Sequence, residues 1–115
     1  MVSPEYDVDV PQFRTDNKEW LLEQIWDMTR KRFKVVDHLL TSKPWDFFML
    51  MEIGVDRIHH GFWDFQDPAH HNYEPGNPFE NAIHDYYVYI DQKIGEWLDK
   101  IDKDTVVLVV SDHGA

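Results

Sequence analysis

The hydrophobic and polar positions of this chain predict four regular elements. Apolar residues recur at every third or fourth position over residues 17–41 and again over 79–101, which is the spacing of one buried helix face. Residues 45–53 and 105–110 are instead almost continuously apolar, and the second run is rich in valine. Short unbroken apolar runs are typical of strands that are buried on both faces of a sheet. The predicted order is therefore helix, strand, helix, strand.

Local signals mark where the predicted helices begin and end. The sequence Asp16-Asn-Lys-Glu19 has the form of a capping box, in which Glu19 reaches back to the backbone of the cap. Pro44 ends the first helix, because proline cannot continue it. Residues 77–80, Asn-Pro-Phe-Glu, form the second start signal. Residues 54–76 show no clear period and are expected to form a long loop, which is uncommon in a compact domain unless it is functional.

The predicted order indicates an α/β fold with helices packed on a sheet. Two buried strands joined through a helix form a βαβ unit, which is parallel and right-handed in nearly all cases. The carboxyl ends of parallel strands lie at the same sheet edge, where ligands bind in open α/β sheets. The residues that follow 53 and 110 are therefore expected to converge. Glu52, near the end of the first strand, is expected to lie at the water line, and the alternative is an outer-shell group that supports a metal ligand.

Composition narrows the possible functions. The chain has 115 residues, of which 43% are hydrophobic, so it is globular and at most one domain. Its net charge of −11 disfavours nucleic acid and anionic membranes as partners, because both require a basic surface, and it favours cation binding. The absence of cysteine excludes disulfides and thiolate metal sites. No apolar run is long enough to cross a bilayer, and the acidic N-terminus is unlike a signal peptide, so a soluble chain is expected.

Metal-binding residue types follow both predicted strands. Asp112 and His113 come directly after the last strand, and Gly114 permits the turn that would bring both side chains to one ion. Asp56 and His60 follow the first strand four positions apart, so they share a face if this stretch makes a helical turn. Two carboxylates and two imidazoles suit Zn²⁺, Mn²⁺ or Fe²⁺. The alternative is two unrelated polar clusters, but their predicted convergence at one sheet edge favours a metal site.

The segment 45–115, which contains these four residues, resembles a known protein family. The sequence Val-Asp56-Arg-Ile-His-His60-Gly-Phe-Trp, an amphipathic helix, and then Val-Val-Ser-Asp112-His113-Gly are similar to the alkaline phosphatase superfamily. The closest resemblance is to its type I phosphodiesterase/nucleotide pyrophosphatase branch. It implies that Asp56 and His60 bind one divalent metal ion and that Asp112 and His113 bind a second, usually zinc. It also implies that the ions hold the phosphoryl group of a phosphate ester while a Thr or Ser attacks phosphorus.

The resemblance further implies that parts of a complete site are missing. In the family the nucleophile and another metal-binding Asp precede the first motif, and a further His follows the second. None of the following hydroxyl residues stands at a predicted strand end: Ser3, Thr15, Thr29, Thr41 and Ser42. Residues 1–115 are therefore interpreted as a single incomplete domain, the middle part of an alkaline-phosphatase-like catalytic domain that is inactive alone. Its truncated sheet would expose strand edges and favour self-association.

Other functions are compatible with the same residues. A cofactor-independent phosphoglycerate mutase and a sulfatase belong to the same superfamily, and the nucleophile segment that distinguishes them is absent here. A different class is a non-catalytic acidic α/β module that binds metal or a protein partner. Neighbouring coding sequence with a Thr or Ser after a strand upstream, and a His motif downstream, would favour the enzyme.

Overall fold

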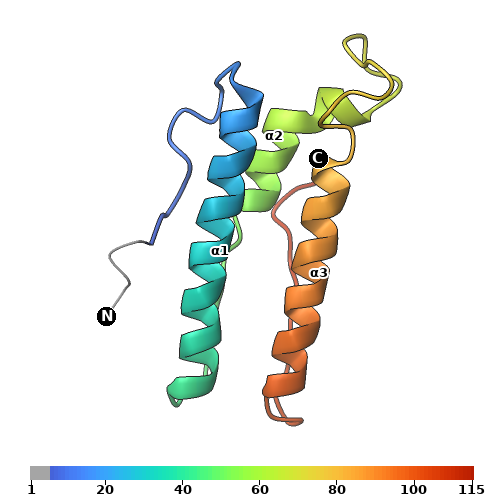
Figure 1. The fold of residues 1–115 in the computed structure, drawn as a ribbon. Coiled ribbons are helices and arrows are strands. Elements are labelled where there is room, and N and C mark those ends of the chain that lie inside the picture. Colours follow the sequence, from blue (N-terminus) through green and yellow to red (C-terminus); the bar gives the residue numbers. More distant parts are fainter. Residues whose placement is uncertain (1–5) are drawn as a thin grey trace.

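Three helices form the framework of the chain in a computed structural model that describes residues 6–115. They are α1 (Lys18–Ser42), α2 (Gly54–Gln66) and α3 (Ala82–Lys100). The long helices α1 and α3 lie lengthwise beside each other, and the shorter α2 packs against both near one end (Figure 1). The molecule measures 49 × 30 × 23 Å. None of the helices in the described part is long and apolar enough to serve as a membrane span.

Helix α1 confirms the helix predicted over residues 17–41. Its buried apolar residues recur at intervals of three to five along one face: Leu21, Ile25, Met28, Phe33 and Val36. The N-cap is Asn17, whose side-chain oxygen accepts a hydrogen bond from the Trp20 backbone N–H at 3.2 Å. The prediction of Asp16 as the cap is therefore wrong by one residue.

The hydrophobic core lies where the three helices meet. Its fully buried apolar side chains come from every helix: Leu21, Ile25, Met28, Ile58, Phe62 and Tyr86. Gly61 lets α2 approach α1 closely, since a Cβ at this position would lie 2.8 Å from the Leu21 side chain. Val10 of the N-terminal segment also belongs to the core. This packing holds both α2 and the N-terminal segment against α1.

Helix α3 confirms the second helical pattern, but it begins later than the predicted start signal. Residues 77–80 form turns ahead of the helix, in which the Asn77 side-chain oxygen accepts a hydrogen bond from the Phe79 backbone N–H at 2.9 Å. The helix itself begins at Ala82, with Asn81 at its N-cap position. Asn77 therefore caps a turn, because asparagine readily bonds the backbone two residues ahead of it.

Helix α2 overturns the prediction of a loop over residues 54–76. Residues 54–66 are helical, and the buried positions of this helix are Gly54, Ile58, Gly61 and Phe62. Gly54, Ile58 and the adjacent pair Gly61 and Phe62 follow one another at steps of three or four residues, as a helix face requires. Glycine occupies two of them, so the apolar period is weak in the sequence. Only the part of the predicted loop after residue 66 lacks a helix, up to the start of α3.

The α/β prediction is wrong, because three helices are the only regular elements of residues 6–115 and these residues contain no strand. Residues 45–53 and 105–110 are neither helical nor paired, and no backbone hydrogen bond joins one segment to the other. A strand is stabilised by hydrogen bonds to a neighbouring strand, and an apolar run does not supply that neighbour. Neither the parallel βαβ unit nor the alkaline-phosphatase-like sheet is present in the described residues.

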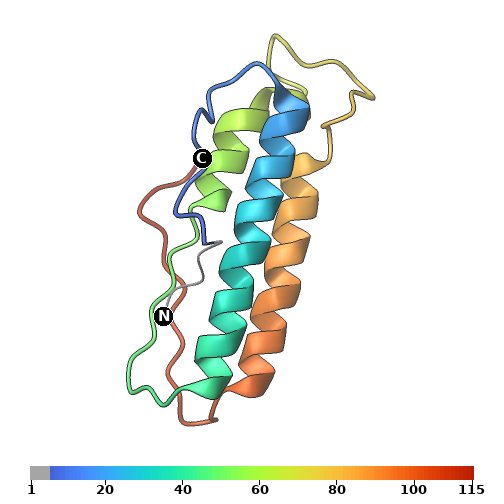
Figure 2. The same cartoon turned by 60° about the vertical axis from the view of Figure 1, so that its left-hand side comes forward.

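The two apolar segments nevertheless run in the same direction along one side of the helices (Figure 2). Their side chains are not buried on both faces. Phe47, Met49 and Met51 are 80%, 77% and 64% exposed, and the residues between them, Phe48 and Leu50, are partly buried. This period of two is that of an extended chain with one face against the protein. Each apolar residue from 106 to 110 is at least 48% exposed.

Candidate metal site

One turn of helix α2 forms the first predicted half-site. Asp56 and His60 stand four residues apart in this helix, so their side chains project from the same face. Asp56 Oδ1 lies 3.3 Å from His60 Nε2. The Asp56 side chain is 29% exposed and that of His60 54%, so an ion from solution can reach both.

The second half-site meets the first at Asp56. His113 Nε2 lies 3.9 Å from Asp56 Oδ1 and 3.7 Å from Asp112 Oδ1. Both views of the molecule show the C-terminus close to α2 (Figures 1 and 2). The two predicted pairs therefore come together, although the sheet that was the reason for expecting this is absent from residues 6–115.

The surroundings of His113 favour its positively charged form. Its Nδ1 lies 2.8 Å from the Gly114 carbonyl oxygen, and the carboxylates of Asp112 and Asp56 stand near Nε2. The bond to the Gly114 carbonyl, followed by the charges of Asp112 and Asp56, raises the pKa of His113 above its usual value.

The donor types and one of the spacings fit a divalent ion. With ligand bonds of about 2.0–2.2 Å, two donors on a tetrahedral ion are about 3.4 Å apart. The 3.3 Å separation of Asp56 Oδ1 and His60 Nε2 matches this value. Within residues 6–115, however, no three His, Asp or Glu side chains are arranged to hold one ion. The donors near the site therefore suit a metal ion two at a time and not as a set of three or more. The presence of metal ions stays a prediction.

His59 makes its contacts on another face of α2. Its Nε2 lies 3.2 Å from the hydroxyl of Tyr87 on α3, and its ring packs edge-on against Trp63. Burial lowers the pKa of His59, which favours its neutral form. His59 therefore belongs to the contact between α2 and α3, and His60 is the histidine that lies beside Asp56.

Glu52 holds the start of α2, a role that the sequence does not predict. Its side chain is 13% exposed, so the expectation that it lies at the water line is wrong. Glu52 Oε1 accepts hydrogen bonds from the Gly54 backbone N–H at 2.7 Å and from the Tyr86 hydroxyl at 3.1 Å. Arg32 Nη1 lies 3.3 Å from the same oxygen. The backbone N–H of Gly54, which has no partner within the helix, is thereby hydrogen-bonded. This bond holds the first turn of α2, which carries Asp56.

This polar network continues into the core. The hydroxyls of Tyr86 and Thr29 lie 2.7 Å apart, and Thr29 also donates to the Ile25 carbonyl oxygen. Burial raises the pKa of Tyr86, so its hydroxyl stays protonated and can donate to Glu52. The signal in the sequence is small. Thr29 and Tyr86 stand among the apolar positions of their helices, and Arg32, which is 2% exposed, belongs to a basic cluster that the sequence indicates as a solvated face.

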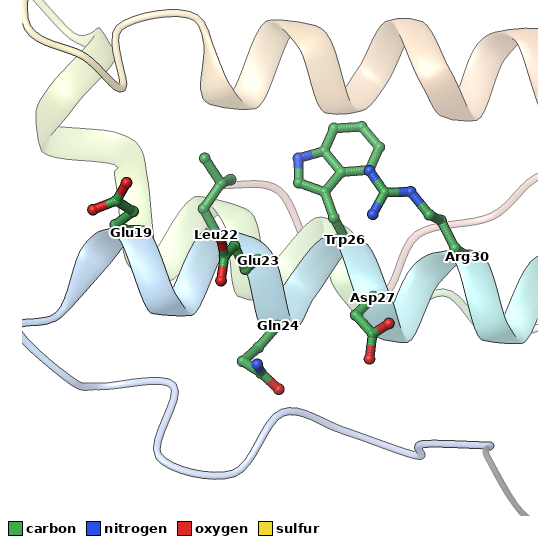
Figure 3. A pocket seen from close by; sticks show the side chains of 7 residues that line it. All are labelled: Glu19, Leu22, Glu23, Gln24, Trp26, Asp27 and Arg30. Atoms are coloured by element: carbon green, nitrogen blue, oxygen red, sulfur yellow. The ribbon is translucent and has the colours of Figure 1, made fainter.

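A shallow hollow on α1 is separate from the candidate site (Figure 3). All the residues that line it belong to α1: Glu19, Leu22, Glu23, Gln24, Trp26, Asp27 and Arg30. The Arg30 guanidinium carbon lies 5.3 Å from the Trp26 ring centroid, so these two side chains form a cation–π pair. None of the four predicted metal ligands lines the hollow.

Comparison with known proteins identifies the family of the chain. The family model described as type I phosphodiesterase / nucleotide pyrophosphatase matches residues 1–115. No match is found among curated proteins or among solved structures. Because the family match spans the whole chain, the protein belongs to the type I phosphodiesterase/nucleotide pyrophosphatase family. This confirms the family that the motifs around Asp56 and Asp112 indicate.

Proposed function

We propose that the chain supplies part of the two-metal centre of a phosphodiesterase that hydrolyses phosphate esters of small molecules. Asp56 and His60 hold one divalent cation, and Asp112 and His113 hold the second. Zinc is the first choice for this set of carboxylate and imidazole donors, and Mn²⁺ and Fe²⁺ accept the same donors. When bound, the two ions would stabilise the attacking and leaving oxygens of the phosphoryl group.

The observation that carries this proposal is the approach of both half-sites to one carboxylate oxygen. Asp56 Oδ1 lies 3.3 Å from His60 Nε2 and 3.9 Å from His113 Nε2. The ions of a two-metal hydrolytic centre lie about 3.5–4 Å apart, so their ligand sets must be neighbours. The family match supports the same chemistry, because it is a match to phosphodiesterases.

Charge supplies a second reason for the cations. The chain has a net charge of −11, and Asp56 and Asp112 place two carboxylates where a phosphate ester would bind. Phosphate esters are anions, so the metal-free site repels the substrate. Bound divalent cations reverse the local charge and allow the substrate to approach.

We also infer that the nucleophile is none of the described hydroxyls of Thr29, Thr41 and Ser111. Thr29 is buried, and Thr41 donates to a carbonyl oxygen of its own helix. Ser111 is next to the candidate site, but its hydroxyl donates to the His113 carbonyl oxygen. Ser3 lies outside the described residues. A covalent route needs an activated hydroxyl that faces the phosphorus, and none of the three described hydroxyls is placed to serve as one.

Zinc affinity of the purified chain tests the proposal. The wild type is expected to bind zinc, as measured by native mass spectrometry and by competition with a chromogenic chelator. Asp56→Asn is expected to weaken binding by more than the roughly 10–100-fold that is typical for loss of an outer-shell partner, because it removes a charged ligand. Asp85→Asn is the matched control, since Asp85 also lies beside a histidine, 3.5 Å from His84, but is not a proposed ligand. Equal affinities of the wild type and Asp56→Asn would overturn the proposal.

A further inference from the structure

Arg57 is hydrogen-bonded to the carboxylate that the proposed function assigns to a metal. Its Nη1 donates a hydrogen bond of 2.6 Å to Asp56 Oδ2. The other oxygen of that carboxylate, Oδ1, faces His60 Nε2 at 3.3 Å and His113 Nε2 at 3.9 Å. The two oxygens of Asp56 therefore have separate partners. One is held by an arginine, and the other is directed toward the two histidines.

Arg57 is itself held by the N-terminal segment. Its Nε and Nη2 donate to the two carboxylate oxygens of Asp9 at 2.8 and 2.7 Å, which is a bidentate pair. This hydrogen bonding lowers the pKa of Asp9 and raises that of Arg57, so both groups stay charged. The Arg57 side chain is only 15% exposed. Because every guanidinium nitrogen has a partner, the group cannot turn without breaking a hydrogen bond.

Phe13 connects the same N-terminal segment to the second residue of the half-site. The Arg57 guanidinium carbon lies 3.9 Å from the centroid of the Phe13 ring, a cation–π contact. The same ring also packs beside His60, with 5.9 Å between the ring centroids. Val10, which is 3% exposed, anchors the segment in the core. The segment thus contacts His60 directly and Asp56 through Arg57.

We propose that Arg57, held by Asp9, is a positioning residue that directs Asp56 Oδ1 toward the metal. This inference rests on the proposed function. Carboxylates that ligate a metal are generally hydrogen-bonded by neighbouring groups, and loss of such a partner typically weakens metal binding about 10–100-fold. A positive charge beside a cation site is unfavourable in itself, since it repels the ion. Arg57 therefore favours metal binding only if its orientation of the carboxylate outweighs that repulsion.

These two effects of Arg57 predict opposite results for the zinc affinity of Arg57→Gln. Removal of the charge alone would tighten zinc binding, whereas loss of positioning would weaken it. We expect a loss of about 10–100-fold, measured by chelator competition at fixed pH. Arg57→Lys keeps the charge but not the planar bidentate fork, so its affinity is expected to lie between those of the wild type and Arg57→Gln.

Lys31→Gln is the matched control. It also removes one positive charge and a contact to the N-terminal segment, because Lys31 Nζ lies 3.0 Å from Asp7. The ion-pair partners of Lys31 are Asp7 and Asp27 and not Asp56. Its zinc affinity is expected to stay within about twofold of the wild type, since exposed charges are screened by salt. Thermal melts followed by circular dichroism verify that each variant is folded at the assay temperature.

A double variant tests whether Asp9 acts through Arg57. Asp9→Asn alone is expected to weaken zinc binding, but in the Arg57→Gln background it should add no further loss. Zinc binding that depends on Asp56 but is unchanged or tighter in Arg57→Gln would overturn this inference and leave the proposed function standing. Failure of the wild type to bind zinc would overturn both.

Discussion

His113 Nε2 lies 3.9 Å from Asp56 Oδ1, so the C-terminal segment and helix α2 meet at one carboxylate. The two sides of this contact are held differently. Asp56 belongs to a helix whose residues Ile58 and Phe62 are fully buried, whereas Asp112 is 91% exposed and follows an unpaired segment. The α2 side of the candidate site is therefore the more rigid one, and we expect it to contribute more to metal affinity.

His60→Ala is expected to weaken zinc binding far more than His59→Ala. Only His60 lies beside Asp56, whereas His59 contacts Tyr87 and Trp63. Loss of a ligand should exceed the effect of losing an outer-shell partner, which is about 10–100-fold. Isothermal titration with zinc gives both affinities. A larger loss for His59→Ala would show that the assignment of the metal-binding face of α2 is wrong.

Gly54→Ala is expected to destabilise the chain by about 2–4 kcal/mol. A Cβ at this position would overlap the Tyr86 hydroxyl and would lie 2.6 Å from Glu52 Oε1. The variant would therefore disrupt the polar network that holds the start of α2. Urea denaturation, followed by circular dichroism, measures the change in the free energy of unfolding.

Gly95→Ala is the control for that experiment. Gly95 is exposed in the interior of helix α3, and an added Cβ would meet no atom within 4 Å. Because alanine has the higher helix propensity, this substitution should stabilise the chain by up to about 1 kcal/mol. Similar destabilisation by both substitutions would contradict the packing assigned to Gly54.

Asp37 is expected to give a pH-dependent contribution to stability by linking α1 to α3. Its carboxylate accepts hydrogen bonds from Trp97 Nε1 at 2.6 Å and from Lys93 Nζ at 3.2 Å. Burial opposes ionisation, but the bonds from Trp97 and Lys93 outweigh it and lower the pKa of Asp37 below its usual value of 3.8. A lowered pKa stabilises the fold above the unfolded-state value, and this contribution is lost as the pH falls through the folded-state value.

Asp37→Asn should therefore reduce the free energy of unfolding at pH 7 by no more than about 1 kcal/mol, given the partial exposure of the pair. At pH 2 the difference between the variant and the wild type should shrink, because the wild-type carboxyl is then becoming protonated as well. Urea denaturation at both pH values provides the comparison. An equal difference at pH 7 and pH 2 would show that the ionised form of Asp37 is not the source of the stability.

The zinc-loaded chain is expected not to hydrolyse bis-p-nitrophenyl phosphate above the rate of zinc alone. Each proposed half-site offers two donors, whereas zinc in proteins normally takes about four ligands. The hydroxyls of Thr29, Thr41 and Ser111 are also not expected to act as the nucleophile. Release of p-nitrophenol measures the rate. Turnover that disappears in Asp112→Ala would show that the chain forms a working site, alone or between copies, and that its interpretation as incomplete is wrong.

Self-association is expected through the two extended apolar segments. Met49 and Leu108 are 77% and 81% exposed, and exposed apolar surface next to unpaired backbone favours pairing with another chain. Light scattering should therefore detect a dimer or larger species. Met49→Lys and Leu108→Lys should shift it toward the monomer, whereas Val88→Lys, at a 42% exposed position on α3, should not. A monomeric wild type would contradict this prediction.

The amino-acid sequence is sufficient to predict helices α1 and α3. A helix makes its hydrogen bonds within one segment, so a period of three to four residues and local capping signals specify it. The same local geometry explains why the spacing of Asp56 and His60 correctly predicts that they are neighbours. Helix α2 as a whole is not predicted, because Gly54 and Gly61 occupy buried positions. Glycine is needed at these two positions because Gly54 packs closely against Tyr86 and Gly61 against Leu21, and both partners lie far away in the sequence.

Tertiary structure decides the features that depend on contacts between distant segments. The apolar runs 45–53 and 105–110 were sufficient to predict extended chain but not a sheet, because strand pairing requires hydrogen bonds between segments. Charged residues in a sequence are usually solvated, so nothing local indicates that Arg57 would bond both Asp9 and Asp56. Packing of the N-terminal segment and α2 against α1 places these groups together, and only a folded chain has that packing.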